Sequence, residues 1–313
     1  MSQDQAPLRV GTRASLLART QSGHVADALR AALDREVVLV EVTTEGDITS
    51  APLSSLGGVG VFVSALRDAL LRGDVDIAVH SLKDIPTYPT EGITLAAVPL
   101  REDPRDVVVA RDGLTLGELP AGSRVGTGSL RRSAQLHALG LGLEIVDIRG
   151  NVDTRIGKVT SGQLDAVLLA RAGLARTGRL DAVTEVLDPL QMLPAPGQGA
   201  LAVECRSEDE FLVDQVRVAL DDTRTRSAVT AERIVLAALE AGCSAPVGAL
   251  AEIAEGEHGD ELWVRAIALS SDGAAAVRKS ATGTPDDAVG VGQRLAAEML
   301  EEGADTLINE RVS

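Results

Sequence analysis

The sequence predicts an α/β protein in which two lobes of alternating strands and helices precede a small C-terminal α+β domain. The chain has 313 residues, more than one ordinary core holds, so two or three domains are expected. Apolar runs of strand length alternate with stretches of helical spacing over the first two thirds. After about residue 224 the order changes to one long helix followed by strands, which is typical of an α+β domain.

The first alternation covers residues 8–80. Apolar residues recur at helical spacing from Leu16 to Leu33, and Gly73 is a stop signal for a second helix. Residues 46–60 are rich in Gly, Ser and Pro and predict a loop of a length that is usually functional or mobile. The predicted order is strand 8–11, helix 16–33, strand 37–43, loop 46–60, helix 61–72 and strand 75–80.

The second alternation lies between two segments that predict crossings between lobes, the charged residues 101–106 and the Pro- and Gly-rich residues 193–199. Its predicted strands are 123–126, 144–148 and 165–170, with helices beginning near Ser129, Val152 and Ala172. The C-terminal prediction is helix 226–241, strands near 249–253, 262–269 and 275–280, a hairpin turn at 271–273, and helix 285–302. The expected domains are lobe 1 at 7–101 with 200–220, lobe 2 at 105–195, and the C-terminal domain at 224–313.

Composition narrows the class of protein. A net charge of −16 repels nucleic-acid phosphates, and four aromatic residues are too few for a base-stacking surface. No apolar run approaches the ~20 residues of a membrane span, and the N-terminus lacks the plan of a signal peptide. Two cysteines make no disulfide framework, and the four histidines show no metal-ligand spacing. We therefore expect a cytoplasmic protein without a metal, a nucleic-acid partner or a membrane partner.

A basic segment stands out against this acidic background. Residues 121–180 hold nine Lys and Arg against four Asp and Glu, whereas the whole chain has 30 against 46. Guanidinium groups bind carboxylates and phosphates in a bidentate manner, so the segment predicts a cleft for a small polyanion. Its arginines mostly come just past predicted strand ends: Arg131, Arg132, Arg149, Arg155, Arg171 and Arg176.

Polar side chains follow the carboxyl ends of several predicted strands, which is where ligands bind in open parallel sheets. One arginine at such a place ordinarily forms a surface ion pair. Arginines recur at four of these strand ends, however, and this favours an anion-binding site. These residues are Thr12, Arg13 and Ser15; Ser81, Lys83 and Asp84; Thr127, Gly128, Ser129, Arg131 and Arg132; Arg149, Gly150, Asn151 and Arg155; and Arg171 and Arg176.

Two residues have both a structural and a functional interpretation. Asp84 could cap a helix or form a salt bridge, or its carboxylate could orient N–H donors and stabilise a cationic intermediate. Cys243 follows the predicted helix 226–241, where the negative end of the helix dipole disfavours a nucleophilic thiolate. A structural thiol at a turn is the alternative for Cys243, and Cys205 is expected in a buried strand.

Nine strings that occur in order across essentially the whole chain resemble the hydroxymethylbilane synthase (porphobilinogen deaminase) family: RVGTRASLLA, DIAVHSLKDIP, REDPRD, VGTGSLRR, DIRGNVDTR, LPAPGQGA, VECR, TAER and EAGCSAPVG. The resemblance implies two lobes similar to periplasmic binding proteins and a third domain that carries a cysteine. It implies a monomeric transferase of porphyrin and heme biosynthesis, which deaminates porphobilinogen and joins it head to tail into the linear tetrapyrrole hydroxymethylbilane. It also implies a dipyrromethane cofactor in thioether linkage to Cys243.

The resemblance also implies roles for single residues. Asp84 would hold pyrrole N–H groups and stabilise the azafulvene cation that forms when ammonia leaves. Cofactor contacts are implied for Lys83, Asp84, Thr127, Ser129, Arg131, Arg132 and Arg155. Substrate contacts are implied for Arg13, Ser15, Gln21, Arg149, Arg155, Arg176 and Gln198. The chain departs from the family at Ser55 and Val59, where lysines are common, and at Gly128, where serine is frequent.

Two other classes remain to be compared with this enzyme. A two-lobed small-anion binding protein without catalysis would be exported and would need neither Asp84 nor a thioether at Cys243. A nicotinamide oxidoreductase would need a complete glycine fingerprint, but Arg131 occupies the third glycine position after Gly126 and Gly128.

Overall fold

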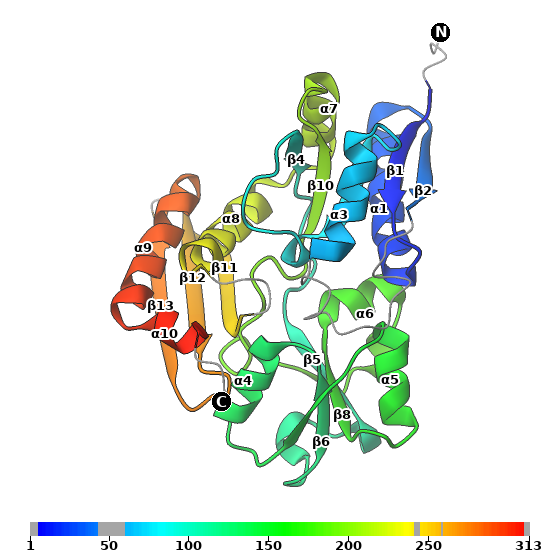
Figure 1. Cartoon of the computed structure of the whole chain (residues 1–313). Helices are drawn as coiled ribbons and strands as arrows, with labels where there is room; N and C mark the ends of the chain where they lie inside the picture. Colours follow the sequence, from blue (N-terminus) through cyan, green and yellow to red (C-terminus); the bar gives the residue numbers. More distant parts are fainter. Residues whose placement is uncertain (1–5, 43–59, 241–244, 258, 310–313) are drawn as a thin grey trace. The chain divides into compact units, whose positions relative to one another are not determined.

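The computed structural model describes residues 6–42, 60–240, 245–257 and 259–309 (Figure 1). The chain divides into two compact units, one formed by Met1–Arg101 with Ala200–Arg226 and the other by Glu102–Gly199 with Ser227–Ser313. In the described ranges, no helix has the length and apolar character needed to cross a membrane.

The first unit is built on a five-stranded sheet with the order β2-β1-β3-β10-β4. Strand β1 pairs in parallel with β2 and β3, whereas β10 is antiparallel to both β3 and β4. The sheet packs on helices through an apolar core that includes Val10, Leu29 and Val216. The elements are β1 Leu8–Thr12, α1 Leu16–Leu33, β2 Val37–Glu41, α3 Gly60–Leu71, β3 Ile77–Ser81, the 3₁₀ turn Leu82–Asp84, β4 Ile93–Ala97, β10 Leu201–Arg206 and α7 Glu210–Leu220.

The second unit contains a sheet of the same plan, with the order β7-β6-β8-β5-β9. Strand β6 is parallel to β7 and β8, and β5 is antiparallel to β8 and β9. The elements are β5 Asp106–Ala110, β6 Arg124–Thr127, α4 Leu130–Ala138, β7 Glu144–Asp147, α5 Val152–Thr160, β8 Ala166–Ala170, α6 Arg171–Thr177 and β9 Glu185–Val186.

In each of the two five-stranded sheets, the strand that runs antiparallel to its neighbours follows a crossing of the chain between the units. Strand β5 is the first strand after the chain leaves the first unit, and β10 is the first strand after it returns. Each of these strands pairs beside a strand of the parallel set and runs against it. The first unit therefore contains residues from both sides of Glu102–Gly199, since β10 belongs to its sheet.

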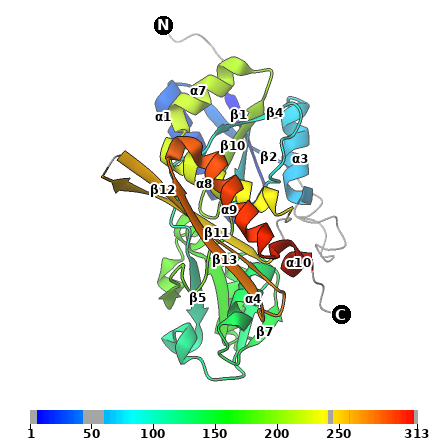
Figure 2. The same ribbon diagram turned by 90° about the vertical axis from the view of Figure 1, so that its left-hand side faces the viewer.

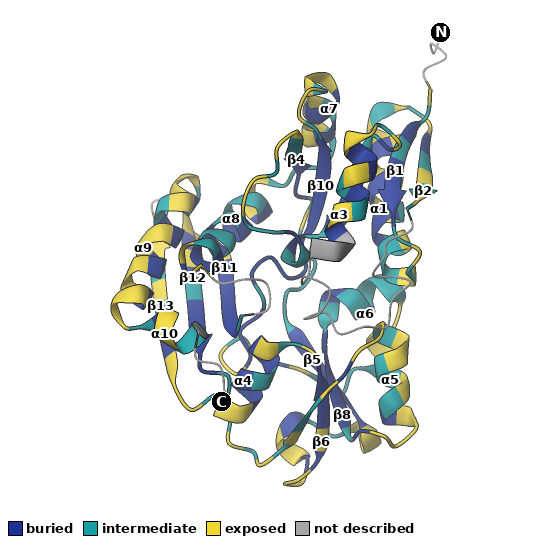
Figure 3. Cartoon of the chain, in the orientation of Figure 1, coloured by how far each residue is buried: buried dark blue, intermediate teal, exposed yellow. Residues whose placement is uncertain are grey.

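The remainder of the second unit is a three-stranded antiparallel sheet with three helices. These are α8 Thr223–Ala238, β11 Val247–Gly256, β12 Gly259–Leu269, β13 Ala276–Gly283, α9 Ala288–Glu301 and α10 Ala304–Asn309. Figure 2 shows α9 lying across this sheet, and residues such as Val235, Val264 and Leu295 form the core between sheet and helices. Alternate residues of β11 and β12 face the other way, where Leu250 and Ile267 pack with Ala134 and Leu193. Parts of β11 and β12 are buried, whereas most of β13 and the outer face of α9 are more exposed (Figure 3).

The predicted fold class, α/β with a small α+β domain, is confirmed by these three sheets. The helix predicted at 226–241 begins earlier, at Thr223, because Asp222 accepts a hydrogen bond from the Thr225 amide and caps it. Strands β4 and β5, of five residues each, and β9, of two residues, were not predicted. The predicted loop 46–60, with Ser55 and Val59, lies outside the described residues except for Gly60, which begins α3.

Candidate active site

The carboxyl ends of β6 and β7 meet at one edge of the sheet in the second unit. Thr127 pairs with Asp147 in the parallel register, so the segments that follow the two strands start side by side. A Cβ atom at Gly128 would lie 2.6 Å from the Ile148 carbonyl oxygen, which shows how closely the two backbones approach. The helix that follows β6 is capped by Ser129, whose Oγ accepts from the Arg132 amide.

Arg131 and Arg132 lie in the first turn of α4 and share one carboxylate, that of Asp106. Arg131 Nη2 is 2.7 Å from Asp106 Oδ2, and Arg132 Nη2 is 2.8 Å from Asp106 Oδ1. The remaining contacts are to backbone carbonyls, Arg131 Nη1 to Leu193 and Arg132 Nη1 to Leu168. Burial opposes ionisation of Asp106, but the two guanidinium groups outweigh it and hold the pKa of its carboxyl well below the ordinary value.

Gln198 belongs to the same buried network. Its Nε2 donates to Asp106 Oδ1 at 2.8 Å and to the Pro104 carbonyl oxygen at 2.7 Å, and the residue is 1% exposed. The predicted substrate contact of Gln198 and the predicted cofactor contacts of Arg131 and Arg132 thus fall on side chains that are anchored to Asp106. These contacts stay predictions.

Arg155 and Arg176 differ from the other arginines of the basic segment. Arg155 Nε donates to the Gly150 carbonyl and Arg176 Nη2 to the Gly199 carbonyl, and neither has a carboxylate at ion-pair distance among the described residues. Burial lowers the pKa of both, and the nearby Arg132 lowers that of Arg155 further. A bound anion would relieve this cost, which makes these two positions the strongest candidates for carboxylate recognition.

Other arginines of the segment are already matched by acids. Arg171 contacts Glu102 at 3.2 Å and Asp103 at 3.4 Å, both in the charged segment that leads into β5. Arg179 lies 2.8 Å from Asp153. Arg149 is exposed and lies two residues after the end of β7, beside Gly150. The net positive charge of residues 121–180 therefore overstates the charge that is available to bind an anion. Acids inside and outside this segment neutralise part of it.

The first unit has a second group of predicted site residues at the carboxyl ends of β1 and β3. Ser15 caps α1 by accepting from the Ala18 amide at 3.3 Å. The buried Gln21 donates from Nε2 to Ser81 Oγ at 3.1 Å, which ties α1 to the end of β3. Lys83 and Asp84 follow in the 3₁₀ turn Leu82–Asp84, and both are half-buried. Arg13 is also half-buried, directly after β1.

The two cysteines have different surroundings. Cys205 is 0% exposed within β10, packs in the apolar core of the first unit, and has a pKa raised to about 12 by burial. A thiol in this position is both inaccessible and hard to ionise, so it is unsuited to carry a covalent group. Cys243 lies outside the described residues.

Sequence reasoning missed the buried acids. Asp106 opens the apolar run of β5, and its burial at 0% could have been suspected from an acid adjoining three valines. Glu204 lies in β10, and Glu232 in α8 accepts from the Gly197 and Ala251 amides. Of these three acids, Glu204 lies within an apolar stretch, which is a sequence signal for a buried, paired carboxylate, whereas Asp106 adjoins the charged residues 101–105 and Glu232 adjoins Arg233.

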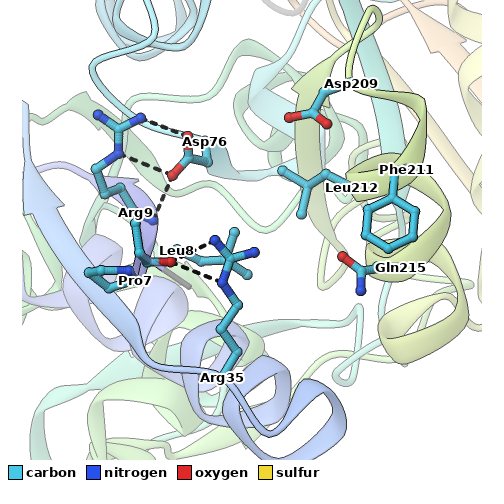
Figure 4. A pocket seen from close by; sticks show the side chains of 10 residues that line it. Pro7, Leu8, Arg9, Arg35, Asp76, Asp209, Phe211, Leu212 and Gln215 are labelled. Carbon is cyan, nitrogen blue, oxygen red and sulfur yellow. Dashed lines mark hydrogen bonds and ion pairs between the residues drawn. The ribbon is translucent and has the colours of Figure 1, made fainter. Parts of the chain in front are cut away.

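A cavity of about 440 Å³ in the first unit is lined by residues that include Arg9, Asp76 and Leu212 (Figure 4). Asp76 lines this cavity and precedes β3, whereas Asp84 follows that strand. Its charged groups contact neighbours in the described chain: Arg9 Nη2 is 2.7 Å from Asp76, and Arg35 Nη2 is 2.6 Å from the Ala6 carbonyl oxygen. Arg9, Asp76 and Arg35 are thus engaged with their neighbours, and we assign no site to this cavity.

Two family models match the chain. Residues 8–214 match "Porphobilinogen deaminase, dipyromethane cofactor binding domain", and residues 227–301 match "Porphobilinogen deaminase, C-terminal domain". The chain is 58% identical over 309 residues to porphobilinogen deaminase of Nocardia farcinica, covering 97% of this chain and 88% of that protein. It is 58% identical over 306 residues to that of Mycobacterium tuberculosis, covering 96% and 98%.

Among solved structures, the chain is similar to the methionine binding protein MetQ, with a TM-score of 0.44 and 14% identity over 68% of this chain and 89% of that one. Both family models and the curated relatives, which match along nearly the full length of the chain, point to one family. The chain belongs to the porphobilinogen deaminase family.

Proposed function

We propose that this chain deaminates porphobilinogen and joins successive units head to tail into hydroxymethylbilane, as a transferase of tetrapyrrole synthesis. Each coupling breaks the carbon–nitrogen bond of the substrate's aminomethyl group and a pyrrole carbon–hydrogen bond, forms a carbon–carbon bond between the two pyrrole units, and releases ammonia, which takes up the displaced proton. The observation that carries the proposal is the pair Arg155 and Arg176, half-buried guanidinium groups bonded only to backbone carbonyls among the described residues. A substrate that brings acetate and propionate groups supplies the missing anions.

The residues of the second unit also fit a dipyrromethane cofactor, which carries carboxylates of the same kind. Arg131 Nε is buried without a hydrogen-bond partner in the described structure, and Arg132 disfavours the charge on Arg155. The residues that would hold the group are Lys83 and Asp84 of the first unit and Thr127, Ser129, Arg131, Arg132 and Arg155 of the second. The cofactor supplies the pyrrole chain end to which new units are added.

Asp84 is the proposed catalytic residue. Its carboxylate would accept hydrogen bonds from pyrrole N–H groups and stabilise the positive charge that develops on the substrate as ammonia departs. The 3₁₀ turn Leu82–Asp84 supports this role because the Ile85 amide bonds to the Leu82 carbonyl and the buried Leu82 fixes the turn to the core. The small-anion binding protein is the alternative function, and it requires no turnover.

Cys243 is the proposed attachment residue, since Cys205 is enclosed in β10. The mass of the intact purified protein tests this directly, because two linked pyrrole units should add to the mass of the sequence. Peptide mapping should find the added mass on Cys243, Cys243→Ser should remove both mass and turnover, and the matched variant Cys205→Ser should keep both. A fully active protein without added mass, or an adduct on Cys205, would overturn the assignment.

Further parts of the proposal concern the organisation of the protein. We propose three domains, 7–101 with 200–220, 105–195 and 224–313, in a monomer that works in the cytoplasm and binds no nucleic acid. The net charge of −16 supports the last point, because nucleic acid would be repelled. Light scattering on a size-exclusion column would give one chain mass for a monomer, and twice that mass would contradict it.

A further inference from the structure

We propose that Asp106 is a positioning residue that converts two diverging arginines into one anion-binding pair; this rests on the proposed function. Arg131 and Arg132 are consecutive in the first turn of α4, where neighbouring side chains project ~100° apart. Consecutive helical residues do not face a common partner unless something draws them together. Asp106, the first residue of β5, does so by accepting from both guanidinium groups.

The two carboxylate oxygens of Asp106 accept hydrogen bonds from different side chains. Oδ2 of Asp106 accepts from Arg131, while Oδ1 accepts from Arg132 and from Gln198 Nε2. The two arginine side chains are 4% and 6% exposed and that of Asp106 is 0% exposed, so this geometry is locked in the core. Gln198 also bonds to the Pro104 carbonyl, which fixes the segment just before β5.

The cluster carries more positive than negative charge. One carboxylate matches only one of the two guanidinium groups, so a buried positive charge remains uncompensated within the cluster. Arg131 Nε has no hydrogen-bond partner among the described residues although it is buried. A buried, unmatched guanidinium is costly unless a ligand completes it. Asp106 thus fixes the direction of the arginines while leaving them the charge to bind a cofactor carboxylate.

The test compares Asp106→Asn with a matched control, Asp76→Asn. Asp76 is also a largely buried carboxylate that contacts two arginines, Arg9 and Arg206, at 2.7 and 3.4 Å, but it lies before β3. We expect Asp106→Asn to lower the fraction of protein that carries the covalent cofactor mass by about tenfold or more, as for loss of charge-assisted hydrogen bonds. Asp76→Asn should lower the melting temperature and leave that fraction unchanged.

Gln198→Ala provides a milder variant if Asp106→Asn does not fold. A role through Asp106 predicts a reduced cofactor fraction for Gln198→Ala, whereas a direct substrate contact predicts a raised KM at full cofactor content. If Asp106→Asn, or Gln198→Ala in its place, keeps the wild-type cofactor fraction, Asp106 is structural only and the inference fails. A wild-type protein that carries no cofactor mass would instead refute the proposed function, which separates the two failures.

Discussion

Arg67 donates from Nε and Nη2 to the two carboxylate oxygens of Glu204, at 2.9 and 2.6 Å, inside the first unit. The pair connects α3 to β10, an inner strand of the sheet, and its side chains are 11% and 3% exposed. His80 Nε2 lies 3.4 Å from Glu204 but without hydrogen-bond geometry, so Arg67 makes the directed contacts. Burial opposes ionisation of Glu204, and the His80 and Arg67 contacts outweigh it, giving a pKa of about 2.

This pair predicts a pH dependence of stability. Since the pKa of Glu204 is lower in the folded chain than its ordinary value of 4.5, its contribution is present above about pH 4.5 and is lost as the pH falls toward about 2. The contribution is on the order of 3 kcal/mol. Urea unfolding between pH 2 and 6 should show that Glu204→Gln is much less stable than wild type at neutral pH and that the gap narrows in acid.

A surface pair serves as the control for that experiment. Asp27 is 72% exposed and pairs with Arg30 one helical turn away, so Asp27→Asn should change the free energy of unfolding by under about 0.5 kcal/mol. A constant difference between Glu204→Gln and wild type across the whole pH range would show that ionisation of Glu204 does not drive the effect.

Asp84→Asn should fold and retain the cofactor mass but lose nearly all turnover. Asparagine keeps the shape of the side chain and lacks the charge that offsets a developing cation, a loss that commonly costs ~3 kcal/mol or about a hundredfold in rate. Single-turnover kinetics on protein of verified mass would measure it. More than about a third of the wild-type rate would indicate that Asp84 is structural, as would a loss of stability of about 1 kcal/mol with normal turnover.

The arginines should divide into two phenotypes. Arg132→Leu should yield protein largely without cofactor, because it removes a member of the pair held by Asp106. Arg149→Leu and Arg176→Leu should keep the cofactor and fail to bind substrate or to elongate the chain. Arg179→Leu is the control, since Arg179 is 47% exposed and pairs with Asp153. Cofactor content and product-chain length, measured together, decide the matter, and identical defects in all variants would indicate only a diffuse positive field.

Two glycines of the second unit should respond in opposite directions to alanine. At Gly128 the new Cβ would lie 2.6 Å from the Ile148 carbonyl oxygen, so Gly128→Ala should force the ends of β6 and β7 apart and lower both stability and cofactor content. At Gly157, inside α5, a Cβ meets nothing within 4 Å, and Gly157→Ala should stabilise the protein by about 0.5–1 kcal/mol. Thermal unfolding of both variants measures this, and a neutral Gly128→Ala would show that the backbones can separate freely.

Sequence alone determined the fold class and the positions of the longer elements. Helix 16–33 was predicted at the residues where α1 occurs, because its apolar spacing is a local signal. The hairpin turn at 271–273 was also predicted, and Gly273 adopts the positive φ that such a turn requires. The nine strings, which occur in order across the chain, identified the family because each is a run of neighbouring residues that can be recognised without knowledge of the fold.

Only the tertiary structure decided which charges of the basic segment are free to act. Arg131, Arg132 and Arg171 look alike in the sequence, yet their carboxylate partners Asp106 and Glu102 precede them in the chain by 25, 26 and 69 residues. The short strand β5 that carries Asp106 has no periodicity to reveal it, because it is buried on both faces and is apolar after its first residue. Ion pairs between distant residues depend on how the sheet is assembled, and local sequence patterns cannot specify that.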